Sequence, residues 1–531
     1  MDPPYSHETR MPASTTNSRI RRPVDPALLT KLPYFRTRAS SALARADEIR
    51  TTRHARVDRD RKATLGQFLT PASAASFAAS FFQRPKGPIR LLDAGAGAGA
   101  LLAACLDRFG AIDAVDAVET DADLLSSLAE ALATARGRGA RVRLIGDCFL
   151  RWGLARPGAG ESGYSHAILN PPYRRLPARS EMRDALREAG LDVANLYTAF
   201  VALAVERLAP DGELVAILPR SFFSGPMHAA FRQWLLDRAA LLRIHAFERR
   251  DAVFGEDGVL QEIVMVHLHK GVAQERIFVS TSSDDGFRDL RVAEYERDAV
   301  LLPRHPHRCI RIPTQGTPTP LDGWPGFGWI LSDLGVSVST GPVIRSRQID
   351  RLRRADEKAA LPLVHTRHHV GPGLAWPAPG DHDDEALSAE APERLSYSRG
   401  HYILVRRYAP KEGARRVMAC HLRPQDLPAH ALRFSVQDRF SILHVSRSGL
   451  SADLAAGLTA YLGTTMVDAH IRTISGTTQI NAADLRALPC PSREVLSDLG
   501  AWAARQSSWP ATAALDDRLD ALLRGTAAPA L

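Results

Sequence analysis

A glycine-rich turn between two structured segments constrains the fold of this chain more than any other feature. The sequence LLDAGAGAGALLAA places an apolar run that predicts a buried strand (89–95) directly before the turn and a helical pattern directly after it. Glycines in a G-x-G-x-x-A arrangement permit a tight turn and let a ligand approach the backbone and the helix N-terminus. The segment therefore predicts one βα unit of an α/β domain, with a ligand site at its turn.

The same rhythm continues along the first half of the chain. Short apolar runs that predict strands recur at residues 111–120, 141–147, 164–170, 213–219 and 260–269. Helical patterns follow the first predicted strand and the runs at 111–120 and 164–170. Strands that alternate with helices imply a mostly parallel sheet with helices on both faces, so the predicted fold class is α/β.

The composition changes at two places and so predicts three parts. Residues 1–44 are rich in Pro, Ser, Thr and Arg and show no apolar period, so we expect a disordered basic tail. A stretch dense in Pro and Gly, from about 303 to 328, marks a boundary. The βα rhythm is lost beyond it. We therefore expect an α/β domain over 45–325 and an irregular α+β domain over 326–531.

Charge and cysteine usage narrow the class of protein. The formal net charge of +9 favours a polyanionic partner, most often a nucleic acid. Five cysteines without CxxC spacing predict neither a disulfide framework nor a zinc knuckle, which fits a reducing cytoplasm. No apolar run is long enough for a transmembrane helix, and no apolar segment of a secretory signal follows the N-terminus. We expect no contact with a membrane.

Acidic residues at strand ends accompany the glycine turn. Glu119 lies 20 residues past Gly99, at the end of the next predicted strand, where a carboxylate can accept hydrogen bonds from both hydroxyls of a ribose. Asp147 ends the third strand and could accept from an adenine amino group. This pattern suits a dinucleotide and S-adenosylmethionine equally well. The candidate cofactor residues around the turn and the strand ends are Asp93, Ala94, Gly95, Gly97, Glu119, Asp147, Cys148 and, after the fourth strand, Asn170.

The tetrapeptide NPPY (Asn170, Pro171, Pro172 and Tyr173) follows the fourth strand directly, at the edge of the sheet where ligands of open α/β folds bind. An adenine N6 amine is a poor nucleophile because its lone pair is delocalised. An Asn carbonyl and the backbone carbonyl of Pro171 can accept its two N–H groups and so free the lone pair, while Tyr173 can stack on the base. The tetrapeptide therefore predicts methyl transfer to an exocyclic amino group.

A second copy, DPPY at residues 2–5, opens the chain. No strand precedes it, and the segment between it and residue 61 is too short and too polar to hold a recognition domain. We interpret this copy as a coincidence.

With these motifs, residues 61–490 resemble the γ-class, TaqI-like DNA adenine-N6 methyltransferases. LGQFLTPASAA resembles the segment before the cofactor turn, whose threonine, here Thr70, contacts the methionine carboxylate in that class. VFGEDGVLQEIVMV resembles the segment whose phenylalanine, here Phe254, stacks on a flipped adenine. Many members carry Phe directly after the third acid, where this chain has Cys148. The resemblance implies S-adenosylmethionine as cofactor and a Rossmann-like domain with a mostly parallel seven-stranded sheet.

The second half resembles a narrower branch, the PstI/BsuBI-like modification methyltransferases. The matching segments are GVSVSTGPVIRSR, YILVRRYAPKEGARRVMA and ISGTTQINAADLRALPCP, although Pro342 and Thr477 replace the usual Arg and His. This resemblance implies a DNA target recognition domain over 326–531. Basic side chains in these segments can meet phosphates, and Arg, Gln or Asn can pair with base edges. The expected DNA-binding residues are Arg345, Arg347, Arg406, Arg407, Lys411, Arg415, Arg416, Gln479 and Asn481.

The predicted function is therefore adenine-specific methylation of duplex DNA by base flipping, in a monomer. The enzyme would be either the modification half of a restriction–modification system, with a separate cognate restriction endonuclease, or a solitary relative in a bacterial cytoplasm. The reaction needs no metal, so His305, His307 and Cys309, and the histidines at 365, 368 and 369, are interpreted as loop residues.

Other classes share parts of this pattern. An NPPY methyltransferase acting on RNA guanine or on a protein glutamine amide uses the same amide-nitrogen chemistry but usually lacks a large C-terminal recognition domain. An inactive DNA-binding relative would not need the intact tetrapeptide. A nicotinamide-dependent dehydrogenase would explain the glycine turn but not NPPY.

Overall fold

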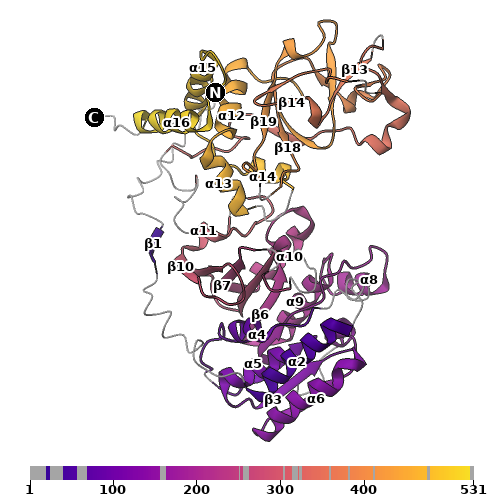
Figure 1. Ribbon diagram of the computed structural model, residues 1–531, viewed down its shortest axis with the longest axis vertical. Helices are drawn as coiled ribbons and strands as arrows, with labels where there is room; N and C mark the ends of the chain where they lie inside the picture. The colour runs from indigo at the N-terminus through magenta and orange to yellow at the C-terminus, as the bar shows by residue number, and fades with distance from the viewer. Residues whose placement is uncertain are drawn as a thin grey trace, which may run out of the picture.

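The chain folds into two parts that lie at opposite ends of the long axis in Figure 1, the first coloured indigo to magenta and the second orange to yellow. The computed structural model describes residues 20–23, 40–56, 68–85, 87–155, 163–249, 252–254, 262–302, 305–313, 321, 326–357, 360–380, 383–410, 413–474 and 479–526. The early DPPY, Lys411 and Thr477 lie outside the described residues.

A ten-stranded sheet forms the centre of the first part, in the order β1-β10-β9-β7-β8-β6-β5-β2-β3-β4. Its strands are β1 (Ile20–Pro23), β2 (Arg90–Ala94), β3 (Ala114–Val118), β4 (Arg141–Ile145), β5 (Tyr164–Leu169), β6 (Leu208–Pro219), β7 (Ala239–Phe247), β8 (Ile263–Lys270), β9 (Ile277–Ser282) and β10 (Arg291–Tyr295). The run from β4 to β6 is parallel, and β8 is antiparallel to both β6 and β7. The predicted α/β class with a mostly parallel sheet is confirmed.

The sheet is wider than the seven strands that the resemblance implies. The seven strands from β4 to β7 are present, and β9 extends them in parallel with β7. β10 and β1 then add antiparallel edges. β1 lies within the segment 1–44 that was expected to be a disordered tail. The rest of that segment up to residue 39 lies outside the described residues.

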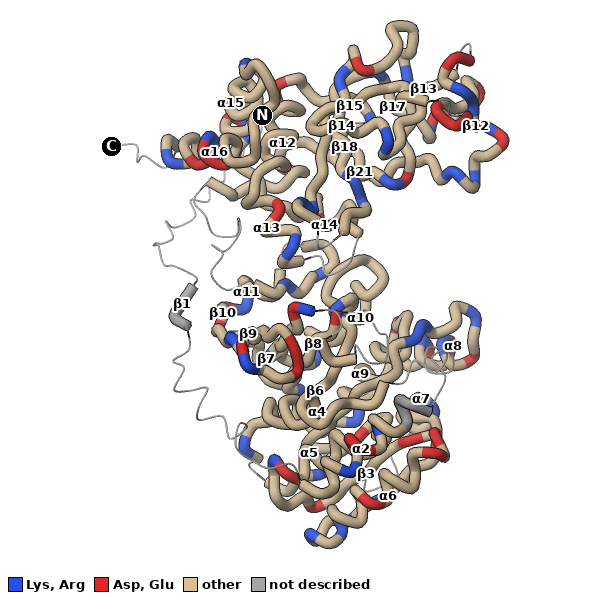
Figure 2. Tube along the Cα trace, viewed as in Figure 1, with Lys and Arg blue, Asp and Glu red and all other residues tan. Residues whose placement is uncertain are grey.

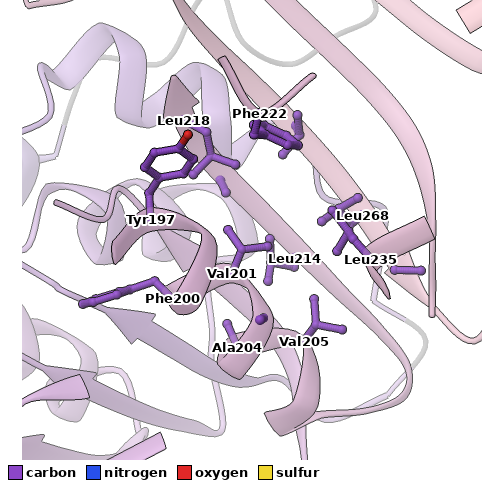
Figure 3. Packing of buried hydrophobic residues seen from close by; sticks show 14 of the residues in the cluster. Tyr197, Phe200, Val201, Ala204, Val205, Leu214, Leu218, Phe222, Leu235 and Leu268 are labelled. Carbon is purple, nitrogen blue, oxygen red and sulfur yellow. The ribbon is translucent and has the colours of Figure 1, made fainter. Parts of the chain in front are cut away.

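Helices cover both faces of the sheet because side chains alternate along its strands. Leu91 and Ile168 point into a core shared with α2, α4, α5 and α6, whereas Leu92 and Ala167 point into the opposite core with α7, α8, α9 and α10. Figure 3 shows this second core, where Tyr197, Val201 and Val205 of α9 meet Leu214 and Leu218 of β6. The helices are α2 (Ser41–Arg56), α4 (Ala72–Ala79), α5 (Ala100–Phe109), α6 (Ala122–Gly137), α7 (Phe149–Leu154), α8 (Glu181–Glu188), α9 (Leu196–Arg207), α10 (Ala229–Leu236) and α11 (Arg297–Val300).

The second part is built from small sheets and a helical cluster. A four-stranded sheet joins β11 (Ser337–Thr340), β21 (Phe440–His444), β18 (Tyr402–Arg406) and β19 (Ala419–Leu422). A five-stranded sheet joins β12 (Leu352–Arg353), β16 (Ala386–Leu387), β13 (Leu361–Val364), β20 (Arg433–Val436) and β17 (Tyr397–Ser398), and β14 (His369–Val370) pairs with β15 (Gly373–Leu374). The helices are α12 (Ala452–Leu462), α13 (Thr465–Ile474), α14 (Ala482–Arg486), α15 (Arg493–Ala504) and α16 (Thr512–Thr526).

The hydrophobic cores divide where the sequence changes. The two cores of the first part end at Ile312, and the three larger cores of the second part begin at Leu321. One small cluster (Leu302, Cys309 and Ile474) joins the two parts. No helix in the described part of the chain combines the length and the hydrophobicity needed to cross a bilayer.

Candidate active site

The glycine turn connects β2 to α5 through residues that require glycine. Gly95, Gly97 and Gly99 all have positive φ angles, between 56° and 86°. A Cβ atom on Gly99 would lie 2.8 Å from the Cβ of Ala131 in α6, so this glycine also lets α5 and α6 pack closely. The glycines therefore allow the tight turn at the carboxyl edge of the sheet, where β2 ends.

Glu119, at the end of β3, is bound to this turn. One carboxylate oxygen accepts a hydrogen bond from the N–H of Gly97 at 2.8 Å, and the other accepts from the N–H groups of Thr120 and Asp121, each at 2.8 Å. The side chain is buried. Because carboxylate oxygens offer several lone-pair sites, Glu119 can still accept from ligand hydroxyls while it fixes the turn.

A cavity of about 360 Å³ opens beside the turn, which is within the usual size range of ligand pockets. It brings together five of the predicted residues, Gly95, Glu119, Asp147, Asn170 and Pro172. The remaining lining residues are Val118, Thr120, Asp121, Ala122, Phe149 and Phe200. A smaller cavity shares Gly95 and Asn170 with it and is lined also by Thr70 and Gly97. The predicted cofactor residues thus meet the tetrapeptide at Gly95 and Asn170.

Two aromatic residues of the larger cavity were missed by the sequence analysis. Phe149 opens α7 and lies 4.8 Å, centroid to centroid, from Phe200 of α9. Cys148 does not line the cavity, and its N–H donates to the Asp147 carboxylate. The aromatic residue that related enzymes carry directly after the acid is therefore present one position later. The Phe next to Cys148 was the signal that could have found it.

Asp93 lies outside the cavities, although the sequence places it among the cofactor residues. Its side chain is fully buried, and neither carboxylate oxygen has a hydrogen-bond partner among the described residues. Burial and the nearby Glu119 carboxylate raise the pKa of Asp93 to about 8. Asp93 in turn contributes, after burial, to the raised pKa of the Cys105 thiol in α5. Asp93 is thus a buried acid beneath the turn, protonated at neutral pH. Ala94 is likewise fully buried and lines neither cavity.

The amide of Asn170 is held in one orientation at the end of β5. Its Nδ2 donates to the carbonyl oxygen of Phe68 at 2.8 Å and to Oγ1 of Thr70 at 3.0 Å. Its Oδ1 accepts from the hydroxyl of Tyr173 at 2.9 Å. Thr70, which the resemblance assigns to the cofactor, therefore also fixes Asn170. These contacts leave a lone pair on Oδ1 for an N–H group of a substrate.

Three aromatic rings gather next to Asn170. The Tyr173 and Phe254 rings lie 6.2 Å apart, nearly perpendicular, so the structure brings the two predicted stacking residues together. Phe68, which the sequence analysis missed, lies 5.7 Å from Tyr173 and 5.8 Å from Phe254. Burial raises the pKa of Tyr173 well above its usual value, so its phenol stays a hydrogen-bond donor. Such a group of rings can hold a flat, aromatic substrate.

The predicted DNA-binding residues fall into two groups. Arg345 and Arg347 are exposed in a short 3-10 helix, η4 (Arg345–Arg347). Arg406 donates to Nδ1 of His369 and to the Thr366 carbonyl, and Arg407 donates to the Asp438 carbonyl, but both keep part of their surface open. These four residues can reach a ligand.

Arg415 and Arg416 instead hold the second part together. Arg416 is fully buried and donates to the Ala409 carbonyl. Arg415 donates to Oγ1 of Thr512 and to the carbonyl oxygens of Leu462 and Thr464. Their placement does not support the expected phosphate contacts, because both guanidinium groups donate hydrogen bonds to other atoms of the protein.

Gln479 and Asn481 stand before α14, and Asn481 lies close to the first part. Gln479 pairs with Tyr408 in an isolated β-bridge. Asn481 caps α14 in a reciprocal arrangement with Asp484, and its Nδ2 lies 3.7 Å from the position of a Cβ on Gly225, in the loop after β6. The segment from 479 to 481 thus connects the basic strands to the carboxyl edge of the large sheet.

A buried polar cluster joins the two parts at the same place. Nε2 of His305 lies 3.5 Å from both Sγ of Cys309 and Oδ1 of Asp484, and all three side chains are buried. Nδ1 of His305 accepts from the N–H of His307, so Nε2 carries the proton and has no lone pair for a metal ion. The geometry favours a polar junction over a metal site. His305 lies in a loop, as expected, whereas His368 ends the 3-10 helix η6 (Thr366–His368). Both side chains are buried and lie next to acids, His305 next to Asp484 and His368 next to Glu385.

A parallel sheet with an acid after β3 and NPPY after β5 is typical of one class of enzymes. The class is that of the S-adenosylmethionine-dependent methyltransferases with a Rossmann-like fold. Comparison with known proteins supports the assignment. The model of the Eco57I restriction-modification methylase family matches residues 139–254.

Two curated relatives match almost the whole chain. The type II methyltransferase M.BsuBI of Bacillus subtilis is 37% identical over 476 residues, which cover 87% of this chain and 94% of the relative. The type II methyltransferase M.PstI of Providencia stuartii is 32% identical over 470 residues, which cover 85% and 92%. This chain belongs to their family of type II methyltransferases. It is a DNA methyltransferase of the restriction–modification class and uses S-adenosylmethionine.

A solved structure with a similar course of the chain is that of the type IIL restriction-modification enzyme MmeI in complex with DNA. The two chains are 10% identical, with a TM-score of 0.48 over 96% of this chain and 76% of MmeI. At this level the likeness carries no argument about activity.

Proposed function

We propose that this enzyme methylates N6 of adenine at a specific sequence of duplex DNA and flips the target base out of the helix. The observation that carries the proposal is the orientation of Asn170. Its Nδ2 is bound by Phe68 and Thr70, so its Oδ1 is the atom available to a substrate amine, beside the rings of Tyr173 and Phe254.

The residues of this chain supply the following steps. Oδ1 of Asn170 and the carbonyl of Pro171 accept the two N–H groups of the adenine amine and so favour a pyramidal nitrogen. Tyr173 and Phe254, whose rings lie 6.2 Å apart, would contact the faces of the base after it has left the duplex. Pro171 and Pro172 fix the backbone that carries both acceptors. Catalysis then rests mainly on positioning.

The cofactor would occupy the cavity beside the glycine turn. The donor set fits S-adenosylmethionine, because Glu119 offers carboxylate oxygens for the ribose hydroxyls and Asp147 lies at the same cavity for the adenine amine. Phe149 and Phe200 supply apolar walls for the adenine ring. When bound, S-adenosylmethionine supplies an electrophilic methyl group on its sulfonium. Asn170 lines both cavities and therefore lies between the cofactor site and the aromatic rings.

The second part would recognise the target. We propose domain boundaries near 45 and 325, supported by the division of the hydrophobic cores between Ile312 and Leu321. The exposed Arg345 and Arg347 and the partly exposed Arg406 and Arg407 would meet DNA, together with Lys411. The enzyme would act as a monomer in the bacterial cytoplasm, on chromosomal DNA, with any cognate restriction endonuclease acting separately.

Expression in a host without DNA methylation tests the proposal. The host DNA is then sequenced by a method that reads modified bases, with Asn170→Ala as the inactive control. We expect N6-methyladenine at one recurring motif and none with the variant. Unmodified DNA, in cells where the protein is folded and binds S-adenosylmethionine, would overturn the proposal and favour an RNA or a protein glutamine as substrate.

A further inference from the structure

One exposed arginine of the recognition part is tied to a carboxylate. Nε of Arg345 donates to Oδ2 of Asp384 at 2.8 Å, although 61% of the arginine side chain remains exposed. Asp384 is 14% exposed and lies 39 residues further along the chain. Among the described residues, neither terminal Nη group of Arg345 has a hydrogen-bond partner. Its guanidinium is therefore fixed at one edge and open at the other.

The carboxylate that holds Arg345 belongs to a network that leads inward. The other oxygen of Asp384 accepts from Arg367, whose Nε donates to Oε1 of Glu385 at 2.8 Å. The second oxygen of Glu385 accepts from the N–H of Ala378, and its side chain is only 2% exposed. Hydrogen bonds from the arginines lower the pKa values of both acids against the effect of burial, so both stay ionised. Asp384 is thus a rigid support and not a free surface acid.

A network that fixes one rotamer is unusual for an exposed arginine whose only role is to interact with solvent. Exposed ion pairs contribute little to stability, and holding a long side chain in one rotamer costs conformational entropy. A fixed rotamer becomes useful when the side chain must bind a ligand in a single geometry, because the entropy is then lost before binding. The network around Asp384 therefore points to recognition.

The charge of the pair distinguishes the possible acceptors. A phosphate is attracted by net positive charge, but Arg345 and Asp384 together are neutral, and the carboxylate repels a phosphate that approaches the same guanidinium. A guanine edge in the major groove is neutral and offers two acceptors, O6 and N7, which match two N–H donors of fixed orientation. The arrangement suits guanine.

A series of hydrogen bonds connects the segment before Arg345 to the neighbourhood of the large sheet. The N–H of Asp438 donates to the Val343 carbonyl, and Arg407 donates to the Asp438 carbonyl. The N–H of Ile480 donates to the Arg407 carbonyl at 2.7 Å. The next residue, Asn481, lies beside the loop after β6, and β6 ends at the catalytic edge of the sheet. Figure 2 shows acidic and basic segments next to one another around β12, close in sequence to Arg345.

We propose that Arg345, held by Asp384, is a specificity-determining residue that pairs with one guanine of the target sequence. The inference rests on the proposed action on duplex DNA and adds the base that this residue selects. Arg347, in the same 3-10 helix, is exposed and has no acidic partner among the described residues. It therefore serves as the matched comparison for Arg345 in the test.

The test compares four variants in the methylation-free host: Arg345→Ala, Arg345→Lys, Asp384→Asn and Arg347→Ala. The modified motif is determined for each one. We expect Arg345→Ala to lose the preference for G at one motif position, by about 5- to 150-fold. Arg345→Lys should weaken the same preference less, because lysine can still donate to guanine but lacks the planar fork of arginine. Asp384→Asn should relax the same position less. Arg347→Ala should keep the motif and lower methylation at all sites.

A binding selection on random duplexes gives a second measurement that does not need catalysis. Thermal unfolding and cofactor binding check that each variant is folded. A lost guanine preference at one position with Arg345→Ala supports the inference. An unchanged motif with Arg345→Ala, or a loss of affinity with Arg345→Ala that is uniform across sequences, would show a phosphate contact and overturn it. If the wild-type enzyme modifies no DNA, the proposed function fails first, whereas an intact wild-type motif that tolerates Arg345→Ala refutes this inference alone.

Discussion

The hydroxyl of Tyr173 donates a hydrogen bond to Oδ1 of Asn170 within the same tetrapeptide, at 2.9 Å. The two residues that the chemistry requires are therefore coupled before any substrate arrives. The same hydroxyl lies 3.3 Å from the Ile217 carbonyl of β6, so the tyrosine ring is also tied to the sheet. The tetrapeptide acts as one unit.

Removal of this hydroxyl should separate two roles of Tyr173, the positioning of Asn170 and the stacking of its ring on the base. Tyr173→Phe keeps the ring but frees Oδ1 of Asn170, so we expect kcat to fall by about 2- to 10-fold, the usual value of one hydrogen bond, with little change in the KM for DNA. Tyr173→Ala should lose far more. Tyr197→Phe, which removes another buried phenol, serves as the control for general destabilisation. Full activity of Tyr173→Phe would contradict the coupling.

Replacement of Asn170 should affect transfer and spare the cofactor. Asn170→Ala removes an acceptor that matters most as the methyl group is transferred, so we expect single-turnover transfer to fall by at least about 100-fold. Binding of S-adenosylmethionine, measured by calorimetry, should weaken by less than about 5-fold, about 1 kcal/mol. An equal loss in both measurements would place Asn170 in the cofactor site and not at the amine.

Replacement of Glu119 should weaken cofactor binding and loosen the turn. Glu119→Gln places an amide N–H₂ opposite a backbone N–H donor, either at Gly97 or at Thr120 and Asp121, which now meet carboxylate oxygens. We expect affinity for S-adenosylmethionine to fall by about 10- to 100-fold, as for a charge-assisted hydrogen bond. The exposed Glu130 of α6 provides a matched control, because Glu130→Gln should bind normally. Normal binding by Glu119→Gln would refute the assignment.

Asp93 predicts an unusual dependence of stability on pH. Its pKa of about 8 lies above the value in an unfolded chain, so the folded state binds the extra proton and the free energy of unfolding falls as pH rises from about 4 to 8. Asp93→Asn removes this effect. The variant should match the wild type near pH 4 and gain stability relative to it up to pH 8, by roughly 5 kcal/mol at most. Urea unfolding at several pH values gives the difference, and a gap that shrinks with rising pH would contradict the prediction.

The sequence predicts those parts of the fold that local patterns encode. β2, β3 and β5 are short apolar runs with glycines or acids at their ends, and all were predicted. β7 was missed because it carries Arg243 and His245 in an apolar stretch. The partners that make these residues acceptable, the Phe81 ring and the Ser280 hydroxyl, come from distant segments.

The residues of the site were likewise predicted where the local sequence identifies them and missed where their role depends on distant segments. Glu119 and Asn170 were predicted because they follow strands directly, and the edge of a parallel sheet collects such residues. Phe68 contributes a ring whose role depends on two distant rings, so its own segment gives no signal. From the sequence, Arg406, Arg407, Arg415 and Arg416 were all expected to bind DNA. Only tertiary packing shows that Arg416 is fully buried while Arg407 remains partly open.

The polar junction between His305 and Asp484 limits how the two halves can be exchanged between relatives. A chimera that takes residues 326–531 from another enzyme inherits the acid from one parent and the imidazole from the other. If the two parents carry different residues at these positions, one polar group is buried without its partner, and the chimera loses stability. The loss arises even when the two halves are joined in an exposed loop. New specificities are therefore more easily obtained by changes within the recognition part than by exchange of the whole part.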